Sequence, residues 1–425
     1  MIKAVTGTKD ILPSEIPIWK HLEKIVENIF ITFNYKEIRT PIFEETSLFS
    51  RGIGEETDIV GKEMYTFFDR SETSLTLKPE MTASVVRAFN ENSLAAKQSL
   101  NKLFYISPMF RQERPQAGRF RQFNQFGGEA LGSDSPLLDA EMIQISYDIL
   151  KQLGLKDITV KINSLGVPKS RENYKKLLRK FLEDKKQNLS EDSRKRFDKN
   201  ILRIFDSKIE SDQKIMKVAP LLIDYLDEES KDSFEEVKSI LNKINIEYEI
   251  DPKLVRGLDY YTKTTFEIVS GKVGSQSALC GGGRYDLLVE ELGGKATPGV
   301  GFAAGIERIL LACENEKSLN LPEENIDVYI VKLDKDLIEK VYEISSFFRR
   351  KNLKVDFDYL DRSVKAQMRE ANKFNSRFVL FVGGEEYKSG SYLFKNMETS
   401  EQELIPFDQL EKILSQNSKV KSQNK

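Results

Sequence analysis

The stretch from Met64 to Gly132 constrains the fold of this chain most, because it reads mainly as β-strands. Its second half holds two strand-like segments, 103–110 and 120–131, which are separated by the polar turn 114–118. Consecutive strands joined by so short a connection pair in antiparallel fashion. We therefore expect an antiparallel hairpin here, preceded by a helix over 81–89.

One face of this hairpin is rich in groups that bind ligands. Side chains alternate between the two faces of a strand, and the face that carries Glu129 also carries Arg119, Arg121, Phe123, Gln125 and Gly127. Arg111 and Glu113 share one parity at the end of the first strand. Arginine at this density suits bidentate recognition of phosphate. The alternative is a hairpin with charges in surface ion pairs, but a glutamine and a glutamate within a core-like strand favour a site.

Two glycine-containing segments carry further candidates. Residues 256–261 read Arg-Gly-Leu-Asp-Tyr-Tyr, which places a cation near the aromatic hydroxyls of Tyr260 and Tyr261; the alternative is the start of a strand with one tyrosine in the core. Residues 281–286 read Gly-Gly-Gly-Arg-Tyr-Asp. They match neither a Walker loop nor a dinucleotide-binding loop, so taken alone they indicate a tight turn.

Two strand-to-helix junctions are also candidates. Residues 299–308 combine small side chains with Arg308 in the first turn of a helix, where both the helix N-terminus and the guanidinium favour anions. The alternative is a glycine-packed junction in which Arg308 pairs with Glu307 or another acid. Glu80 lies where a strand becomes a helix, and an ordinary N-cap at Thr82 is the alternative there.

The rest of the chain divides by composition. Residues 167–245 are rich in Lys, Asp, Glu and Ser with helically spaced apolar positions, which predicts a small helical insertion with a mixed-charge, solvated surface. Residues 315–325 are polar and read as a linker between domains. From residue 328 on, strands and helices alternate, which predicts a small α/β sheet with parallel pairs. The tail from Ser415 is polar.

Composition excludes several classes of protein. The chain has 425 residues and only one histidine, His21, which excludes a multi-histidine metal site and leaves a Ser-His-Asp triad only if that residue serves it. Two cysteines, Cys280 and Cys313, make a disulfide framework implausible and fit a reducing compartment. No apolar run is long enough to span a bilayer and no signal-peptide core begins the chain. The formal net charge of -2 means that a polyanion would have to meet a local basic surface.

Together these segments resemble the class II aminoacyl-tRNA synthetases. Thr40 and Pro41, with the helix before them, resemble the dimer-interface motif 1 of that class, residues 110–129 resemble motif 2, and residues 299–308 resemble motif 3. The resemblance implies an α+β catalytic domain with an antiparallel sheet over residues 1–325, interrupted by the helical insertion at about 167–245. It also implies a C-terminal α/β anticodon-binding domain over residues 326–425 that ends in the polar tail.

Within the class, the chain resembles the histidyl branch. Residues 256–261 and 281–286 resemble the two stretches peculiar to that branch, and the opening Gly-Thr-Lys-Asp-Ile-Leu-Pro at 7–13 matches as well. Motif 1 alone is a weak signal, whereas motif 2 together with Arg-Gly-Leu-Asp-Tyr-Tyr is highly specific. Met81 and Ala83 beside Glu80 depart from the expected neighbours, which affects only the local pocket wall.

The resemblance implies a role for each candidate residue. Arg111 would hold the α-phosphate of ATP and Arg308 the γ-phosphate, while Arg256 would stabilise charge near the reacting carboxylate. Arg111 and Arg256 are thus the catalytic candidates. The other expected contacts are Glu113 and Arg119 with the nucleotide, Glu80, Thr82 and Gln125 with the α-amino group of histidine, Glu129 and Tyr261 with its imidazole, Tyr260 with the pocket wall, and Gln116 with the tRNA acceptor end.

The implied reaction is histidine–tRNA ligation in two steps, through histidyl-adenylate and pyrophosphate. The implied partners are L-histidine, ATP, tRNA(His) and a second copy of the chain, with Mg²⁺ bridging phosphate oxygens, no dedicated protein metal site and no membrane. The cytoplasm is the expected compartment. Two alternatives are a histidine-sensing regulatory paralogue and a synthetase-like tRNA-sensing module. The first is expected to lack the C-terminal domain and Arg256, and the second to lose motif residues and to sit beside other domains.

Overall fold

The computed structural model describes residues 1–54, 57, 59–116, 118–255, 260–273, 278–319 and 325–410. The chain divides into two compact units, Met1–Asn320 and Leu321–Lys425, which are described separately below. Arg256 and the polar tail, both named in the sequence analysis, lie outside the described residues.

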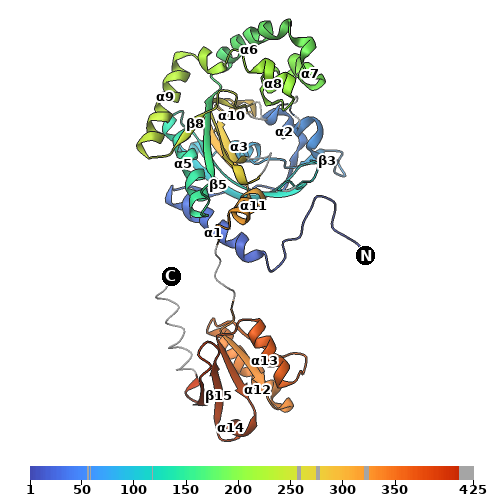
Figure 1. Cartoon of the computed structure of the whole chain (residues 1–425), viewed down its shortest axis with the longest axis vertical. Coiled ribbons are helices and arrows are strands. Elements are labelled where there is room, and N and C mark those ends of the chain that lie inside the picture. The colour runs from blue at the N-terminus through green and yellow to red at the C-terminus, as the bar shows by residue number, and fades with distance from the viewer. Residues whose placement is uncertain are drawn as a thin grey trace. The chain divides into compact units, whose positions relative to one another are not determined.

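An eight-stranded sheet forms the centre of the first unit (Figure 1). Its order is β1-β5-β6-β11-β10-β9-β7-β8, and all neighbours from β5 to β7 are antiparallel, while β1 and β8 pair in parallel at the two edges. This architecture confirms the predicted α+β fold with an antiparallel sheet. The strands are β1 (Lys36–Glu37), β5 (Asn101–Phe110), β6 (Gln122–Leu131), β7 (Ile158–Ser164), β8 (Tyr248–Ile250), β9 (Thr262–Ser270), β10 (Ala278–Arg284) and β11 (Gly299–Gly305).

Long helices cover one face of this sheet and bury its main apolar core. In α1 the residues Leu22, Val26 and Phe30 recur at helical spacing and are fully buried, as expected for an amphipathic helix. They pack with sheet residues such as Phe104 and Phe302. The helices that contribute to this core are α1 (Ile16–Thr32), α5 (Pro136–Gln152), α9 (Glu228–Lys243) and α11 (Ile306–Glu316).

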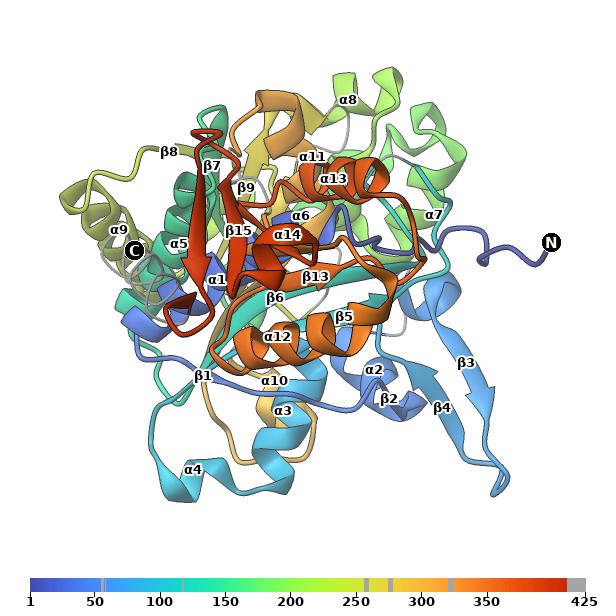
Figure 2. The same ribbon diagram turned by 90° about the horizontal axis from the view of Figure 1, so that it is seen from below.

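The opposite face of the sheet carries the helix α3 (Thr82–Glu91), the short helix α10 (Leu288–Glu291) and a second apolar cluster, which includes Tyr105, Tyr260 and Tyr285. A three-stranded antiparallel sheet, in the order β2-β4-β3, extends from the edge of this unit (Figure 2). Its strands and the elements beside it are β2 (Phe43–Glu45), α2 (Thr46–Ile53), η1 (Ile59–Glu63), β3 (Tyr65–Phe68) and β4 (Ser74–Leu77). The short helix α4 (Leu94–Lys97) follows α3 in the chain.

The stretch between β7 and β8 is helical, as the sequence predicts. It does not form one separate body, because its last helix α9 places Phe234, Val237 and Leu241 in the core beside α5. The charged composition of α9 hides this inward stripe. The preceding elements are α6 (Pro168–Glu183), η2 (Lys186–Asn188), α7 (Glu191–Lys199), η3 (Ile201–Asp206), α8 (Glu210–Met216) and η4 (Leu222–Tyr225).

The second unit is an α/β sheet of five strands in the order β13-β12-β14-β15-β16. β12 pairs in parallel with both β13 and β14, and the last two strands are antiparallel, which agrees with the predicted strand–helix alternation. The elements are β12 (Val328–Lys332), η6 (Lys335–Leu337), α12 (Ile338–Arg350), β13 (Val355–Phe357), α13 (Val364–Lys373), β14 (Phe378–Val382), α14 (Gly384–Lys388), β15 (Ser391–Asn396) and β16 (Gln402–Pro406).

Within the described residues, no helix is both long and apolar enough to pass through a membrane.

Candidate active site

A cavity of about 310 Å³ opens on the face of the central sheet that the long helices leave uncovered. Its walls come from β6, β10 and β11, from the loop between β5 and β6, and from the start of α3. Several residues that the sequence singled out line it together, namely Glu80, Thr82, Arg111, Glu113, Arg119, Gln125, Tyr260, Tyr261 and Arg308. Segments that lie far apart in the sequence therefore meet at one place.

Glu129 lies in β6 and is fully buried beneath the cavity. Its Oε1 accepts hydrogen bonds from Thr82 Oγ1 at 2.8 Å and from the Tyr105 hydroxyl at 3.5 Å, and its Oε2 accepts one from the Tyr285 hydroxyl. Burial raises the pKa of Glu129 to about 8, although the three hydroxyl donors favour the charged form. A second carboxyl, on Glu80, adds to this rise.

Gly301 of β11 makes room for this carboxyl. A Cβ atom on Gly301 would lie 1.7 Å from Glu129 Oε2, which is far inside the contact distance of any two atoms. The glycine is therefore required by the close approach of the carboxylate.

Glu80 caps the N-terminus of α3. Its carboxylate oxygens accept the main-chain N–H groups of Thr82 at 2.8 Å and Ala83 at 2.9 Å. Thr82 is the first residue of the helix and not its N-cap, so the alternative that the sequence left open is wrong. Burial raises the pKa of Glu80, while these N–H donors oppose the rise. The capping contact fixes the Glu80 side chain at the cavity wall.

Tyr260 and Tyr261 stand together at the start of β9, and only 6% and 5% of their surfaces are exposed. Their ring centroids are 4.8 Å apart, and the ring of Tyr285 meets that of Tyr260 edge-on at 5.7 Å. Three aromatic rings thus form a compact wall beside Glu129.

Gln125 offers an unused acceptor. Its Oε1 is buried, and in the part of the chain that the structure describes no group donates a hydrogen bond to it. An unpaired buried acceptor is costly. Because Gln125 lines the cavity, a ligand with an N–H donor, such as an ammonium group, would satisfy it.

Three guanidinium groups line the other part of the cavity. Arg111 Nε donates to Pro79 O at 2.9 Å, and its guanidinium lies 5.3 Å from the ring of Phe123. Arg119 Nη1 pairs with Glu113 Oε2 at 2.9 Å, and Arg111 Nη1 lies 3.7 Å from Glu113 Oε1. One carboxylate is thus shared between two cations.

Arg308 completes the cationic group. It donates from Nη1 to Ala278 O at 3.1 Å and from Nε to Gly118 O at 3.4 Å. Burial lowers its pKa, and the charges of Arg119 and Arg111 lower it further. An anion between the three guanidinium groups would stabilise the charged form of Arg308 and reduce the repulsion among the arginines. The geometry therefore suits a polyphosphate.

Glu307, the neighbour of Arg308, has a different role from the pairing that the sequence left open. Its carboxylate accepts hydrogen bonds from Asn124 N at 2.8 Å and from Asn124 Nδ2 at 3.0 Å. Glu307 therefore links the start of α11 to β6 and is not paired with Arg308.

Gln116 lies on the turn between β5 and β6 and exchanges main-chain hydrogen bonds with Arg119 at 2.8 and 3.2 Å. It lines a second, more open cavity of about 390 Å³, whose other walls include Lys62, Arg114 and Pro115. Glu113 and Arg119 line both cavities, so the two cavities are neighbours that share part of their walls.

Sequence reasoning missed Tyr105 and Tyr285 as members of the site. Tyr105 pairs with Gly127 in the β5–β6 register, and Glu129 lies two residues further along the same face, so hairpin parity contained a signal for it. Tyr285 stood in the 281–286 segment, which was singled out as a turn and as a stretch of the histidyl branch, but Tyr285 itself was given no role. The predicted catalytic Arg256 lies outside the described residues, and the roles assigned to the other site residues remain predictions.

In the part of the chain that the structure describes, no cluster of three or more His, Cys, Asp or Glu side chains could hold a metal ion. Glu113 and Glu267 are carboxylates on the cavity wall. Glu113 lies beside Arg111 and Arg119, and Glu267 lies within β9.

Comparisons with known proteins cover both units. A family model described as histidyl-tRNA synthetase matches residues 7–309, and one described as anticodon binding domain matches residues 327–417. A histidine–tRNA ligase of Caldanaerobacter subterraneus subsp. tengcongensis is 46% identical over 415 residues, which is 97% of this chain and 99% of the relative. A histidine–tRNA ligase of Halothermothrix orenii is 49% identical over 402 residues, 94% of this chain and 96% of the relative.

A solved structure gives the same result. The crystal structure of apo histidyl-tRNA synthetase from S. aureus superposes with a TM-score of 0.83 at 38% sequence identity, and covers 97% of this chain and 100% of that one. The similarity therefore extends over the catalytic cavity and the C-terminal unit alike.

Proposed function

The chain belongs to the histidyl-tRNA synthetase family, and from this premise we infer that it is a histidine–tRNA ligase. It activates L-histidine with ATP to histidyl-adenylate and pyrophosphate, and then transfers histidine to the 3′ end of its cognate tRNA. The observation that carries this conclusion is the cavity itself, which joins three guanidiniums to a buried carboxyl and tyrosine pocket.

We propose that the carboxyl and tyrosine part of the cavity binds histidine. Glu80, Thr82 and Gln125 surround the α-amino group, and the unsatisfied Oε1 of Gln125 supports this placement. Glu129 and Tyr261 read the two ring nitrogens, while Tyr260 lines the pocket. An amino acid without these nitrogens would leave buried polar groups unpaired, which is a strong form of discrimination.

The guanidinium part of the cavity binds ATP. Arg111 holds the α-phosphate and Arg308 the γ-phosphate, with Glu113 and Arg119 also facing the nucleotide. The mutual repulsion that lowers the pKa of Arg308 supports an anionic occupant. Mg²⁺ bound with the nucleotide would neutralise charge on the phosphates, and Glu113 and Glu267 are two of the carboxylates on the cavity wall.

The chain contributes positioning and electrostatics to the chemistry. The histidine carboxylate attacks the α-phosphorus in line, and Arg111 stabilises charge on the phosphoryl oxygens. By the resemblance to the family, Arg256 would stabilise charge near the reacting carboxylate. In the second step a hydroxyl of the terminal tRNA ribose attacks the acyl carbon. Neither step requires a protein nucleophile, which agrees with a chain that has one histidine and two cysteines.

The tRNA would contact both units. The acceptor end meets the turn between β5 and β6, where Gln116 and the second cavity lie. The second unit, which matches an anticodon-binding family, binds the anticodon. Single-stranded bases are bound by stacking and by contacts to their edges.

We also propose that the active form is a homodimer in the cytoplasm. Four apolar side chains near Thr40 and Pro41 are exposed, namely Ile42, Phe43, Phe67 and Phe68. Exposed apolar residues grouped on one small sheet are typical of protein interfaces. The chain has only two cysteines and both are buried, which suits a reducing compartment.

The decisive experiment is ATP–pyrophosphate exchange with purified protein, one amino acid at a time. Exchange with histidine alone is the expected result. We expect Arg256→Ala to abolish that exchange and to leave the unfolding temperature unchanged. The reason is that the role proposed for its guanidinium is to stabilise charge during the reaction. Unchanged activity of the variant would refute the role of Arg256, and no exchange by folded parent protein would favour a regulatory paralogue instead.

A further inference from the structure

We propose that Arg284 is a positioning residue for histidine recognition, and that it acts through Asp286 and Thr262 on the adjacent Tyr261. This inference rests on the proposed function, because it concerns the same histidine pocket. Arg284 itself does not line the cavity, so its effect has to pass through its neighbours.

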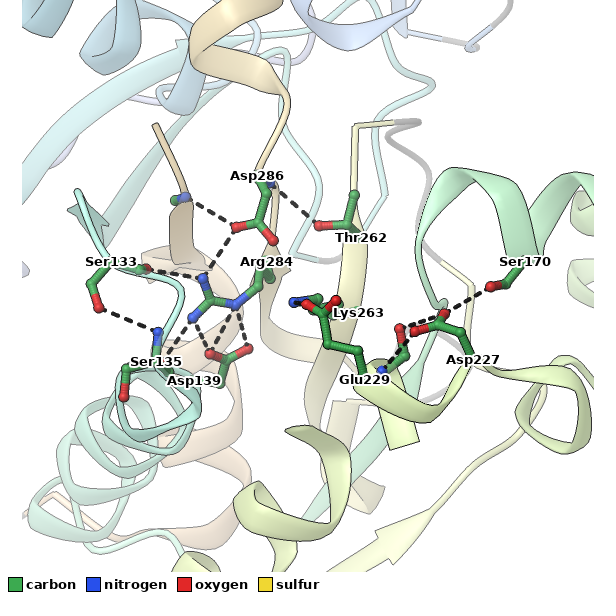
Figure 3. A network of polar contacts seen from close by, with 12 residues as sticks. Ser133, Ser135, Asp139, Ser170, Asp227, Glu229, Thr262, Lys263, Arg284 and Asp286 are labelled. Carbon is green, nitrogen blue, oxygen red and sulfur yellow. Dashed lines mark hydrogen bonds and ion pairs between the residues drawn. The ribbon is translucent and has the colours of Figure 1, made fainter. Parts of the chain in front are cut away.

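Arg284 is a fully buried charge at the end of β10 and is held on several sides (Figure 3). It forms an ion pair with the fully buried Asp139 of α5, to which Arg284 Nε donates at 3.0 Å and Nη2 donates as well. Arg284 Nη1 donates to Ser133 O and Nη2 to Ser135 O, each at 3.0 Å. The planar guanidinium thus fixes the end of β10 to the start of α5.

The same guanidinium reaches towards the pocket through Asp286. Arg284 Nη1 donates to Asp286 Oδ1 at 3.1 Å, and that oxygen also accepts the N–H of Gly299 at 3.3 Å. The main-chain N–H of Asp286 donates to Thr262 Oγ1 at 3.3 Å (Figure 3). Arg284 and Asp286 therefore tie the first residue of β9 to the neighbouring strands.

This tie lies at an irregularity in the pairing of β9 with β10, while the main chain of Lys263 is held on its other side by hydrogen bonds with Leu165 and Gly166. Thr262 pairs with Arg284 but Thr265 pairs with Gly283, so the register shifts and Lys263 and Thr264 form a bulge. Lys263 also has a positive φ of 39°, a conformation that residues with a Cβ adopt rarely. Bulges re-aim neighbouring side chains and often lie beside active sites.

Tyr285 and Tyr261 are both joined to this arrangement through the main chain. Tyr285 lies between Arg284 and Asp286 in the sequence and donates to Glu129. Tyr261 directly precedes Thr262. A displacement of Thr262 would therefore move the phenol that is proposed to read the imidazole, while the three guanidiniums of the ATP site would stay in place.

Stability alone gives a weak reason for such a buried pair. Removing two charges from water is expensive, and apolar residues of similar volume are often as stabilising. A bidentate pair instead specifies one geometry, and the position of Tyr261 is what that geometry determines here.

The test compares Thr262→Val with Thr262→Ser. Valine keeps the shape but removes the acceptor Oγ1, whereas serine retains it. We expect Thr262→Val to raise KM for histidine in ATP–pyrophosphate exchange by about fivefold to tenfold, because the Asp286 N–H loses its acceptor. KM for ATP should stay within about twofold of the parent value, and Thr262→Ser should restore the parent KM for histidine.

Arg284→Lys is the second variant. Lysine keeps a charge opposite Asp139 but lacks the fork that reaches Asp286 and two carbonyls at once. We expect it to raise KM for histidine at least as much as Thr262→Val does. If it fails to fold, Thr262→Val carries the test, since the Thr262 hydroxyl accepts a main-chain N–H and not a buried charge.

Calorimetric titration with histidine supplies a readout that does not depend on turnover, and it should show the same loss of affinity in Thr262→Val. Equal histidine affinity in parent and Thr262→Val would overturn the inference. A parallel rise of both KM values with a lower unfolding midpoint would also overturn it, because that pattern indicates a general structural defect. Failure of the parent protein to exchange with histidine would instead contradict the proposed function.

Discussion

Replacement of Glu129 by glutamine separates the effect of this carboxyl on the stability of the fold from its effect on histidine binding. The residue is fully buried, and its pKa is raised to about 8 because it is removed from water. Glutamine has nearly the same shape and never ionises. The hydroxyls of Thr82, Tyr105 and Tyr285, which donate to Glu129, can donate to its amide oxygen or accept from its amide nitrogen.

The sign of the effect follows from proton linkage. A carboxyl with a folded-state pKa of about 8 and an ordinary value of 4.5 retains its proton in the folded state over that interval. Its contribution to stability is therefore complete below pH 4.5 and is lost as the pH rises to about 8. At about 1.4 kcal/mol per pH unit, the parent protein loses roughly 3 kcal/mol by pH 7. Glu129→Gln does not undergo this loss.

The assay is urea denaturation followed by tryptophan fluorescence. Trp19 is the only tryptophan and packs in the core of the first unit, so it reports the unfolding of the unit that contains Glu129. We expect the difference in free energy of unfolding between Glu129→Gln and the parent to grow by about 1.4 kcal/mol per pH unit between pH 5 and 8. Histidine affinity should fall by at least about tenfold. A difference that does not change with pH would refute this reasoning.

Three further results are expected. Gly301→Ala should reduce the rate of histidine-dependent exchange by more than about a hundredfold, because the new Cβ would lie 1.7 Å from Glu129 Oε2. Gly61→Ala is the control, since a Cβ at Gly61 would meet no atom within 4 Å, and its exchange rate should match that of the parent. Arg308→Ala should raise KM for ATP by at least about tenfold while calorimetry shows unchanged histidine affinity; a loss of histidine affinity would place Arg308 elsewhere. Histidine binding at pH 7 should release protons, since its ring N–H favours the charged form of Glu129, whose pKa is raised to about 8. Calorimetry in buffers of different ionisation enthalpy measures that release, and identical heats in all buffers would contradict it.

The sequence predicted much of the fold because local patterns were strong. The β5–β6 hairpin followed from two strand-like runs and a polar turn, and the α/β character of the second unit from strand–helix alternation. The place of α9 did not follow, because Phe234, Val237 and Leu241 are separated by charged residues in a stretch that reads as a solvated surface. Only the tertiary structure shows that this stripe completes the core beside α5.

The site was predictable where chemistry was concentrated in one segment and less so where it was assembled from several. Arg111, Glu113 and Arg119 stood together on one turn. Tyr105 was missed, because a tyrosine in an apolar strand is usually a core residue. Its hydroxyl has a functional meaning only because Glu129 lies on the neighbouring strand.

The least predictable property is the charge state of the pocket, because it depends on burial and not on residue identity. Glu80 and Glu129 are ordinary carboxyls in the sequence, but the fold removes both from water and raises the pKa of each. The pKa of Glu129, at about 8, keeps its carboxyl protonated in the empty pocket at pH 7, and a ligand with a ring N–H favours its ionisation. An amino acid with an apolar side chain would bring no such donor to Glu129. Selection for histidine therefore depends on the same desolvation that lowers the stability of the folded protein as the pH rises from 4.5 to about 8.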